Sequence, residues 1–179
     1  MKILGFAGSN SSQSINRKLV SYVSSYFGGH EVEILDLNDY EMPIYSMDRE
    51  RDNGIPQLAC DFAQKIDVSD LLIVSLAENN SAYSAAFKNI FDWVSRIASR
   101  KVFGRKPMFL MATSPGTRGG ASVLEIAKAR FPRSGADIID TFSLPAFYEN
   151  FDDAKGIVNL ELRLQLESKI KLVKDYLLI

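Results

Sequence analysis

A loop rich in hydroxyl and amide side chains, Gly8–Asn16, lies between an apolar run and the first amphipathic segment. It supplies four serines and two asparagines, and it opens a helix whose free N–H groups and positive dipole end favour an anion. This composition predicts a phosphate-binding loop, although a serine that only caps the helix would explain one of the hydroxyls. The candidate phosphate contacts are Ser9, Ser11, Ser14, Ile15 and Asn16.

Two further polar segments follow apolar runs, Ala77–Ser84 and Thr113–Gly120. The second has three glycines within five residues, which let a backbone approach a flat ligand closely, although a turn before a helix explains one or two of them. Arg118 is either a partner for an anionic group of a ligand or a solvated surface residue. The candidate ligand contacts here are Glu78, Asn79, Asn80, Ser81, Ser114, Gly116, Arg118, Gly119 and Gly120.

The chain offers few side chains for acid–base, nucleophilic or metal chemistry. His30 is the only histidine and follows two glycines in a turn, so no histidine-based triad is expected. Cys60 is the only cysteine and falls in an amphipathic segment, where a small core residue is expected. No cluster has the spacing of metal ligands.

Five apolar runs alternate with five segments of helical periodicity. This alternation predicts a single α/β domain over residues 1–179, a three-layer sandwich with helices on both faces of a five-stranded parallel sheet. The flavodoxin-like strand order 2-1-3-4-5 places a ligand beyond the carboxyl ends of strands 1 and 3. The polar segments above follow strands 1, 3 and 4. The expected strands are 2–7, 31–35, 71–75, 107–112 and 136–142, and the expected helices are 14–27, 57–66, 85–97, 121–131 and 160–178.

Composition narrows the class of protein further. The 179 residues are 46% hydrophobic and carry a net charge of −1, which argues against a nucleic-acid-binding protein. No apolar run reaches the length of about 18 residues typical of a membrane span. A single cysteine excludes an intramolecular disulfide framework, and we therefore expect a cytoplasmic protein without nucleic-acid or membrane partners.

Taken together, these segments resemble the NADPH-dependent FMN reductase family, which includes azo, quinone and chromate reductases. That family shows Gly-Ser-x-Arg-x-x-Ser-x-Asn after strand 1, Pro-Glu-Tyr-Asn-x-Ser and then Leu-Lys-Asn-x-x-Asp-Trp after strand 3, and Ser-x-Gly-x-x-Gly-Gly after strand 4. Here the order and spacing are matched by Gly8–Asn16, Ala77–Ser81, Phe87–Trp93, Ser114–Gly120 and the connection Pro43–Asp48.

The resemblance implies an NAD(P)H-dependent oxidoreductase that carries FMN and passes two electrons to a quinone, azo, metal-oxyanion or flavin acceptor. It implies that Ser9, Ser14 and Asn16 contact the phosphate, that Asn80 and Ser81 lie near the ribityl chain, and that Ser114, Gly116 and Gly119 line the ring. It also implies a homodimer or homotetramer, with Tyr45 and Asp48 near a shared edge. The electron donor is either NADPH or NADH. The sequence does not distinguish them, because it contains no recognisable binding site for the 2′-phosphate of NADPH.

Two departures from the family pattern bear on cofactor binding. Ser11 stands where many relatives have an arginine, so the phosphate would depend on hydroxyls, amides and the helix dipole. Asn79 stands where relatives have the tyrosine that packs against the ring, and Tyr83 is a candidate replacement. Two alternatives therefore stay open: a flavodoxin-type electron carrier without nicotinamide activity, and a flavin-free binding relative.

Overall fold

A five-stranded parallel sheet forms the middle layer of the molecule. The computed structural model describes all residues, 1–179. The strand order is β2-β1-β3-β6-β7, which confirms the predicted flavodoxin-like topology. Every neighbouring pair in this sheet is parallel, so all five carboxyl ends meet at one edge. The strands are β1 (Lys2–Gly8), β2 (Glu31–Leu35), β3 (Leu71–Leu76), β6 (Lys106–Thr113) and β7 (Ala136–Leu144).

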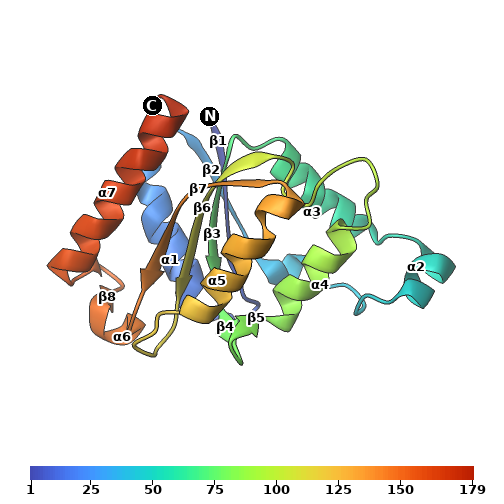
Figure 1. Cartoon of the computed structure of the whole chain (residues 1–179), viewed down its shortest axis with the longest axis horizontal. Coiled ribbons are helices and arrows are strands. Elements are labelled where there is room, and N and C mark those ends of the chain that lie inside the picture. The colour runs from blue at the N-terminus through green and yellow to red at the C-terminus, as the bar shows by residue number, and fades with distance from the viewer.

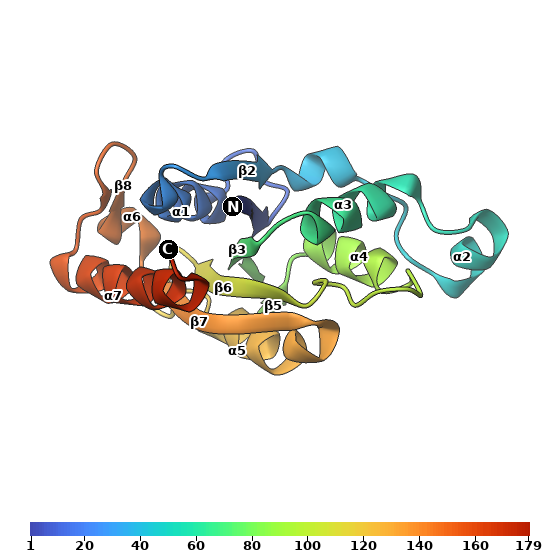
Figure 2. The ribbon, with the colours of Figure 1, turned by 90° about the horizontal axis from the view of Figure 1, so that it is seen from above.

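The central strands are continuous apolar runs because helices cover both of their faces. All six residues of β3 are buried, and six of the eight residues of β6 are buried. In Figures 1 and 2, α1 and α7 lie on one face of the sheet, and α3, α4 and α5 lie on the other. These helices are α1 (Ile15–Ser24), α3 (Gln57–Asp67), α4 (Ala85–Val94), α5 (Ala121–Arg130) and α7 (Leu160–Leu177).

The two faces of the sheet have different cores. Aliphatic side chains of α1 and α7 dominate one, whereas the other contains a group of aromatic rings. Phe103 and Phe131 lie at the centre of that group, with ring centroids 4.5 Å apart, and Phe91 stacks on Phe131. Each fully buried ring contributes about 1.5–3 kcal/mol to stability, so this cluster fixes α4 and α5 against the sheet.

Several short elements were not predicted. Helix α2 (Met47–Asn53) lies inside a segment expected to be a long connection, and Figures 1 and 2 show it projecting away from the sheet. None of its residues is buried, so it has no apolar periodicity to reveal it. Its start is explained by Ser46, whose hydroxyl accepts the backbone N–H of Arg49. The other unpredicted elements are β4 (Glu78–Asn79), β5 (Ala82–Tyr83), α6 (Phe147–Asn150), β8 (Phe151–Asp152) and β9 (Gly156–Ile157).

No helix combines the length and the apolar character needed to cross a membrane.

Candidate functional site

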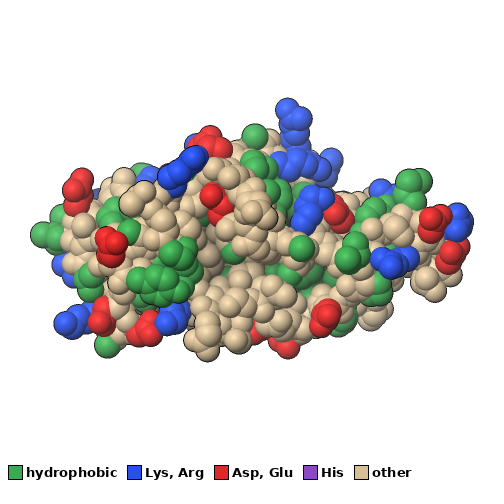
Figure 3. All heavy atoms as spheres, turned by 90° about the horizontal axis from the view of Figure 1, so that it is seen from below, with side chains coloured by type: hydrophobic (Ala, Val, Ile, Leu, Met, Phe, Trp, Pro, Cys, Tyr) green, Lys and Arg blue, Asp and Glu red, His purple; other side chains and the backbone are tan.

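Three loops meet at the carboxyl edge of the sheet and line an open cavity of about 230 Å³. They follow β1, β3 and β6, as the topology predicts. Figure 3 looks at this end of the molecule, where uncharged atoms cover most of the centre and charged side chains lie mostly toward the edges. The predicted site residues that line the cavity are Ser9, Ser11, Ser14, Ile15, Asn16, Glu78, Asn79 and Ser114.

The loop after β1 is held by its own serines. The Ser9 hydroxyl accepts the backbone N–H of Ser11, and the Ser11 hydroxyl accepts that of Gln13, both at 3.2 Å. Ser14 caps α1 by accepting the N–H of Arg17 at 3.2 Å. All three hydroxyls act as acceptors in these bonds, so each keeps its own proton to donate to a ligand.

Backbone donors complete this array. The N–H groups of Ile15 and Asn16 have no partner within the chain, as expected for the first turn of a helix. Ile15 and Asn16 line the cavity, and the positive end of the α1 dipole lies there. The arrangement suits an anion with several acceptor oxygens, above all a phosphate.

The Asn16 side chain has a positioning role inside the protein. It is only 3% exposed, and its Nδ2 donates to the Thr113 carbonyl at 3.2 Å. Its Oδ1 accepts the Thr113 N–H at 3.1 Å and the Ser75 hydroxyl at 2.7 Å. This one amide therefore ties the start of α1 to the ends of β3 and β6. A direct contact of Asn16 with phosphate is left to its backbone N–H.

The segment after β3 forms a β-hairpin, β4–β5, and leads into α4. Asn80 and Ser81 form its two-residue turn, with φ of 50° and 64°, and neither lines the cavity. Ser84 caps α4 and also donates to the Gly8 carbonyl at 2.8 Å, which joins the end of β1 to the start of α4. The Glu78 carboxylate accepts the N–H of Val123 at 2.9 Å, so it caps α5 across the cavity edge.

The glycine-rich loop after β6 packs mainly against the end of β7 rather than lining the cavity. Gly119 and Gly120 have φ of 58° and 77°, and the Ser143 hydroxyl donates to the Gly119 carbonyl at 2.9 Å. Arg118 is exposed and donates to the Ser122 hydroxyl at 3.0 Å, which favours the surface interpretation. Gly116 has open space around it, with the Ser114 hydroxyl 3.9 Å from the position of an added Cβ. Gly116, Arg118, Gly119 and Gly120 do not line the cavity, so their contact with a ligand stays a prediction.

Tyr83 does not replace the aromatic ring that Asn79 lacks. Its ring stacks on Phe131 at 5.8 Å in the core behind the cavity, and its buried hydroxyl has no hydrogen-bond partner. Burial of this hydroxyl raises the pKa of Tyr83 to about 12, partly opposed by the nearby Arg130. The expectation that Tyr83 faces a ligand is therefore wrong, because its ring completes the aromatic cluster.

We expect Tyr83→Phe to stabilise the protein by about 1 kcal/mol at pH 7, because it removes a buried, unpaired hydroxyl. The raised pKa also means that the wild type loses stability as pH rises from about 10 to about 12, because the tyrosine ionises more readily in the unfolded chain. The variant has no hydroxyl at this position and should not show that loss. Urea unfolding at pH 7 and pH 11 measures both effects. Equal stability of the two proteins at both pH values would contradict the assignment.

Sequence reasoning missed one aromatic side chain at the cavity. Tyr148, on α6, lines the cavity beside Pro115 and is 72% exposed. Helix α6 is fixed to the loop after β6 because Ala146 N–H donates to the Gly116 carbonyl and Phe147 N–H to the Ser114 carbonyl. The adjacent aromatic residues Phe147 and Tyr148, shortly after β7, were the signal in the sequence that could have indicated this contact. The other lining residues not predicted are Gln13, Ala77, Thr113 and Pro115.

The fold and this site define a flavodoxin-like α/β protein with a donor-rich anion cavity at the switch point of its sheet, and Glu78, the one charged residue that lines it, accepts the N–H of Val123. The chain belongs to the NADPH-dependent FMN reductase family, whose model matches residues 1–154. This match confirms the resemblance inferred from the motifs.

Two curated relatives and one solved structure are similar to the chain, the structure in its fold. The chain is 31% identical over 122 residues to a 2-hydroxy-1,4-benzoquinone reductase of Burkholderia sp., covering 68% of this chain and 64% of that protein. It is 30% identical over 81 residues to a quinone reductase of Escherichia coli K12, covering 45% and 43%. The chain thus spans less than two thirds of either relative. The fold matches the flavoenzyme NAD(P)H:(acceptor) oxidoreductase FerB of Paracoccus denitrificans with a TM-score of 0.74, 22% identity and 97% coverage of both chains.

Proposed function

We propose that this protein is an NAD(P)H-dependent oxidoreductase that binds FMN at the carboxyl edge of its sheet and reduces a small acceptor such as a quinone or an azo compound. The observation that carries the proposal is the donor array after β1. There, backbone N–H groups without a partner and serine hydroxyls whose protons are free to be donated face one cavity. Family membership and the quinone reductases among the relatives support the reaction class.

The chain's own residues would bind and orient the cofactor. The loop after β1 would hold the phosphate, and Ser114, Asn79 and Tyr148 would lie along the rest of the molecule. When bound, FMN accepts a hydride from a nicotinamide and delivers two electrons to the acceptor. No titrating side chain of the chain is needed for that chemistry, and Glu78, the one charged residue that lines the cavity, already accepts the N–H of Val123.

The phosphate assignment predicts a contrast between FMN and riboflavin, which lacks the phosphate. We expect Ser11→Glu to lower FMN affinity at least thirtyfold, because a carboxylate beside the donor array repels a phosphate dianion. Riboflavin affinity should change less than twofold. Fluorescence titration of apo-protein measures both, and Ser168→Glu on the exposed side of α7 is the matched control.

Activity is then tested by steady-state oxidation of NADPH or NADH with a quinone as acceptor. Turnover with bound FMN supports the reductase. FMN binding without nicotinamide oxidation would favour the electron carrier, and no FMN binding at millimolar concentration would overturn the proposal.

Tyr148 should supply part of the aromatic surface that Asn79 does not. We expect Tyr148→Ala to weaken FMN binding about tenfold, since stacking on a ring is worth about 1–3 kcal/mol per aromatic. Tyr148→Phe should bind like the wild type. The side chain is 72% exposed, so neither change should alter the free energy of unfolding by more than about 0.5 kcal/mol. An alanine variant that binds FMN normally would place the flavin elsewhere.

We also propose that the protein is a homodimer in which the segment around α2 contributes to the interface. The base of this segment is fixed to α4, because Trp93 Nε1 donates to the Pro43 carbonyl at 2.7 Å. Its Ile44 and Met47 side chains are nevertheless 75% and 79% exposed, which is unusual for large apolar residues. Sedimentation at micromolar concentration tests this proposal, and a monomer would contradict it.

Cytoplasmic localisation stays a prediction from the single cysteine.

A further inference from the structure

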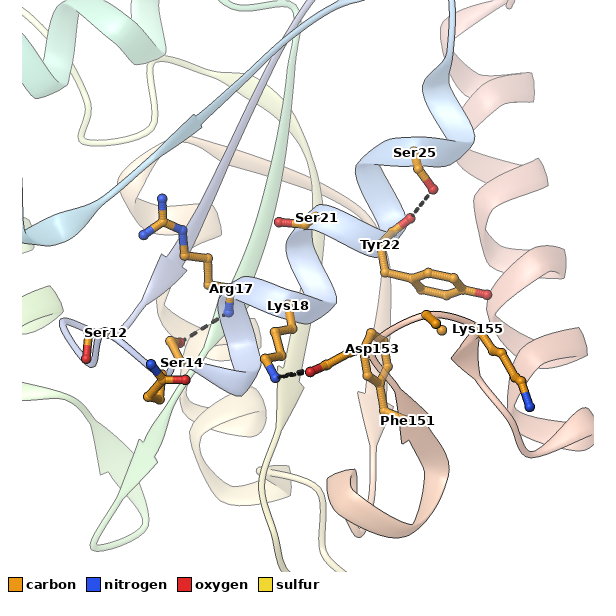
Figure 4. Close-up of a pocket in the computed structure, with 13 residues that line it drawn as sticks. Ser12, Ser14, Arg17, Lys18, Ser21, Tyr22, Ser25, Phe151, Asp153 and Lys155 are labelled. Atoms are coloured by element: carbon orange, nitrogen blue, oxygen red, sulfur yellow. Dashed lines mark hydrogen bonds and ion pairs between the residues drawn. The ribbon is translucent and has the colours of Figure 1, made fainter.

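A cavity of about 650 Å³ lies between α1 and the β8–β9 hairpin (Figure 4). It adjoins the FMN cavity, because Gln13 and Ser14 line both. Its volume falls within the range of about 300–1,000 Å³ typical of small-molecule sites. The loop after β1 therefore has a cavity on each side, of about 230 Å³ and about 650 Å³.

The walls of this second cavity are cationic and rich in hydroxyls. Ser14, Lys18, Ser21 and Ser25 follow one another at helical spacing along one side of α1. Lys18 and Lys155 line the cavity against a single acidic residue, Asp153, so an anionic ligand is favoured. Tyr22 and Phe151 add aromatic surface, with ring centroids 5.6 Å apart.

Lys18 is the basic group best placed for a ligand. Its Nζ donates to both carboxylate oxygens of Asp153 at 2.8 Å, as Figure 4 shows. The lysine and aspartate side chains are 38% and 72% exposed, so the pair is solvated and contributes little stability. An incoming phosphate can replace Asp153 at small cost. Arg17, by contrast, turns to the other side of α1 and pairs with Asp36.

We propose that this cavity binds the adenylate half of FAD, so that the protein accepts FAD as well as FMN. The proposal rests on the function proposed above. FAD is FMN extended at its phosphate by AMP, so its additional half must leave the FMN cavity where the phosphate is held. That point is the Gln13–Ser14 wall that the two cavities share. Lys18 would then meet the second phosphate, and the adenine would pack near Tyr22.

The test compares FMN and FAD binding to apo-protein by flavin fluorescence titration. Wild type should bind FAD within about tenfold of FMN. Ser21→Trp places a large ring in the second cavity from an exposed helical position, and it should weaken FAD binding at least tenfold while FMN affinity changes less than twofold. Ser168→Trp, the same change at an exposed position of α7, should leave both affinities as in wild type.

Three results would overturn the proposal. FAD binding a thousandfold weaker than FMN binding would show that the protein leaves no room for a group attached to the FMN phosphate. Equal FAD affinity in wild type and Ser21→Trp would place the adenylate in solvent, and displacement of FAD by NADPH at this position would assign the cavity to the electron donor. In each case FMN still binds, so the proposed function stands; failure of both flavins to bind would overturn that function as well.

Discussion

Asn16→Ala is expected to lower the free energy of unfolding by about 3–4 kcal/mol. The substitution removes three hydrogen bonds at once, two to the backbone of Thr113 and one to the hydroxyl of Ser75. Ser75 and Thr113 are 0% and 1% exposed, so water cannot replace the lost partner. Each buried group left unpaired costs about 1–3 kcal/mol, and the cavity left by the amide adds to that loss. Urea unfolding at pH 7 measures the change.

Asn10→Ala is the matched control. Asn10 belongs to the same loop, but it is exposed, and its side chain makes no hydrogen bond within the protein. We expect its variant to remain within about 0.5 kcal/mol of the wild type. If Asn16→Ala loses less than 1 kcal/mol, the junction of α1, β3 and β6 does not depend on this amide.

Gly119→Ala should destabilise the protein by about 3 kcal/mol. Its φ of 58° disfavours any side chain by about 1–2 kcal/mol. An added Cβ would also overlap the Ser143 hydroxyl and lie 2.9 Å from the Pro145 nitrogen, so the end of β7 would have to shift. Overpacking of this kind costs about 1–3 kcal/mol.

Gly116→Ala is the matched control for this packing effect, because it changes a glycine of the same loop that has open space around it. The glycine has ordinary φ, and the nearest atom to an added Cβ is 3.9 Å away, so its variant should be as stable as the wild type. Thermal unfolding of both variants makes the comparison. Equal loss of stability in the two variants would mean that the whole loop is sensitive, irrespective of the space around each residue.

The five-stranded sheet and its five main helices could be predicted because their periodicity reports burial. Leu71–Leu76 is apolar throughout, and helices cover both of its faces. Helix α2 could not be predicted in this way, since it buries nothing. The β4–β5 hairpin depends on an Asn80–Ser81 turn with positive φ at both residues, and Ser81 is not a residue that signals such a turn.

The position of the site could be predicted from topology, but the roles of its residues could not. A sequence does not show which polar side chains form hydrogen bonds within the protein and which are free for a ligand. The Asn16 amide and the Glu78 carboxylate both form such internal bonds. The glycines after β6 suggested close approach of a ligand, whereas Gly119 is required by the neighbouring end of β7. Tyr148 follows β7, and only the three-dimensional structure brings it to the same cavity as Pro115.

The phosphate cavity contains no lysine or arginine, and this has an entropic consequence. A long cationic side chain loses up to about 2 kcal/mol of conformational freedom when it is ordered around an anion. Here the N–H groups belong to the helix itself, and the Ser9, Ser11 and Ser14 hydroxyls are already held by backbone donors. Binding a phosphate at this loop therefore orders very little of the chain, because folding has already met that cost.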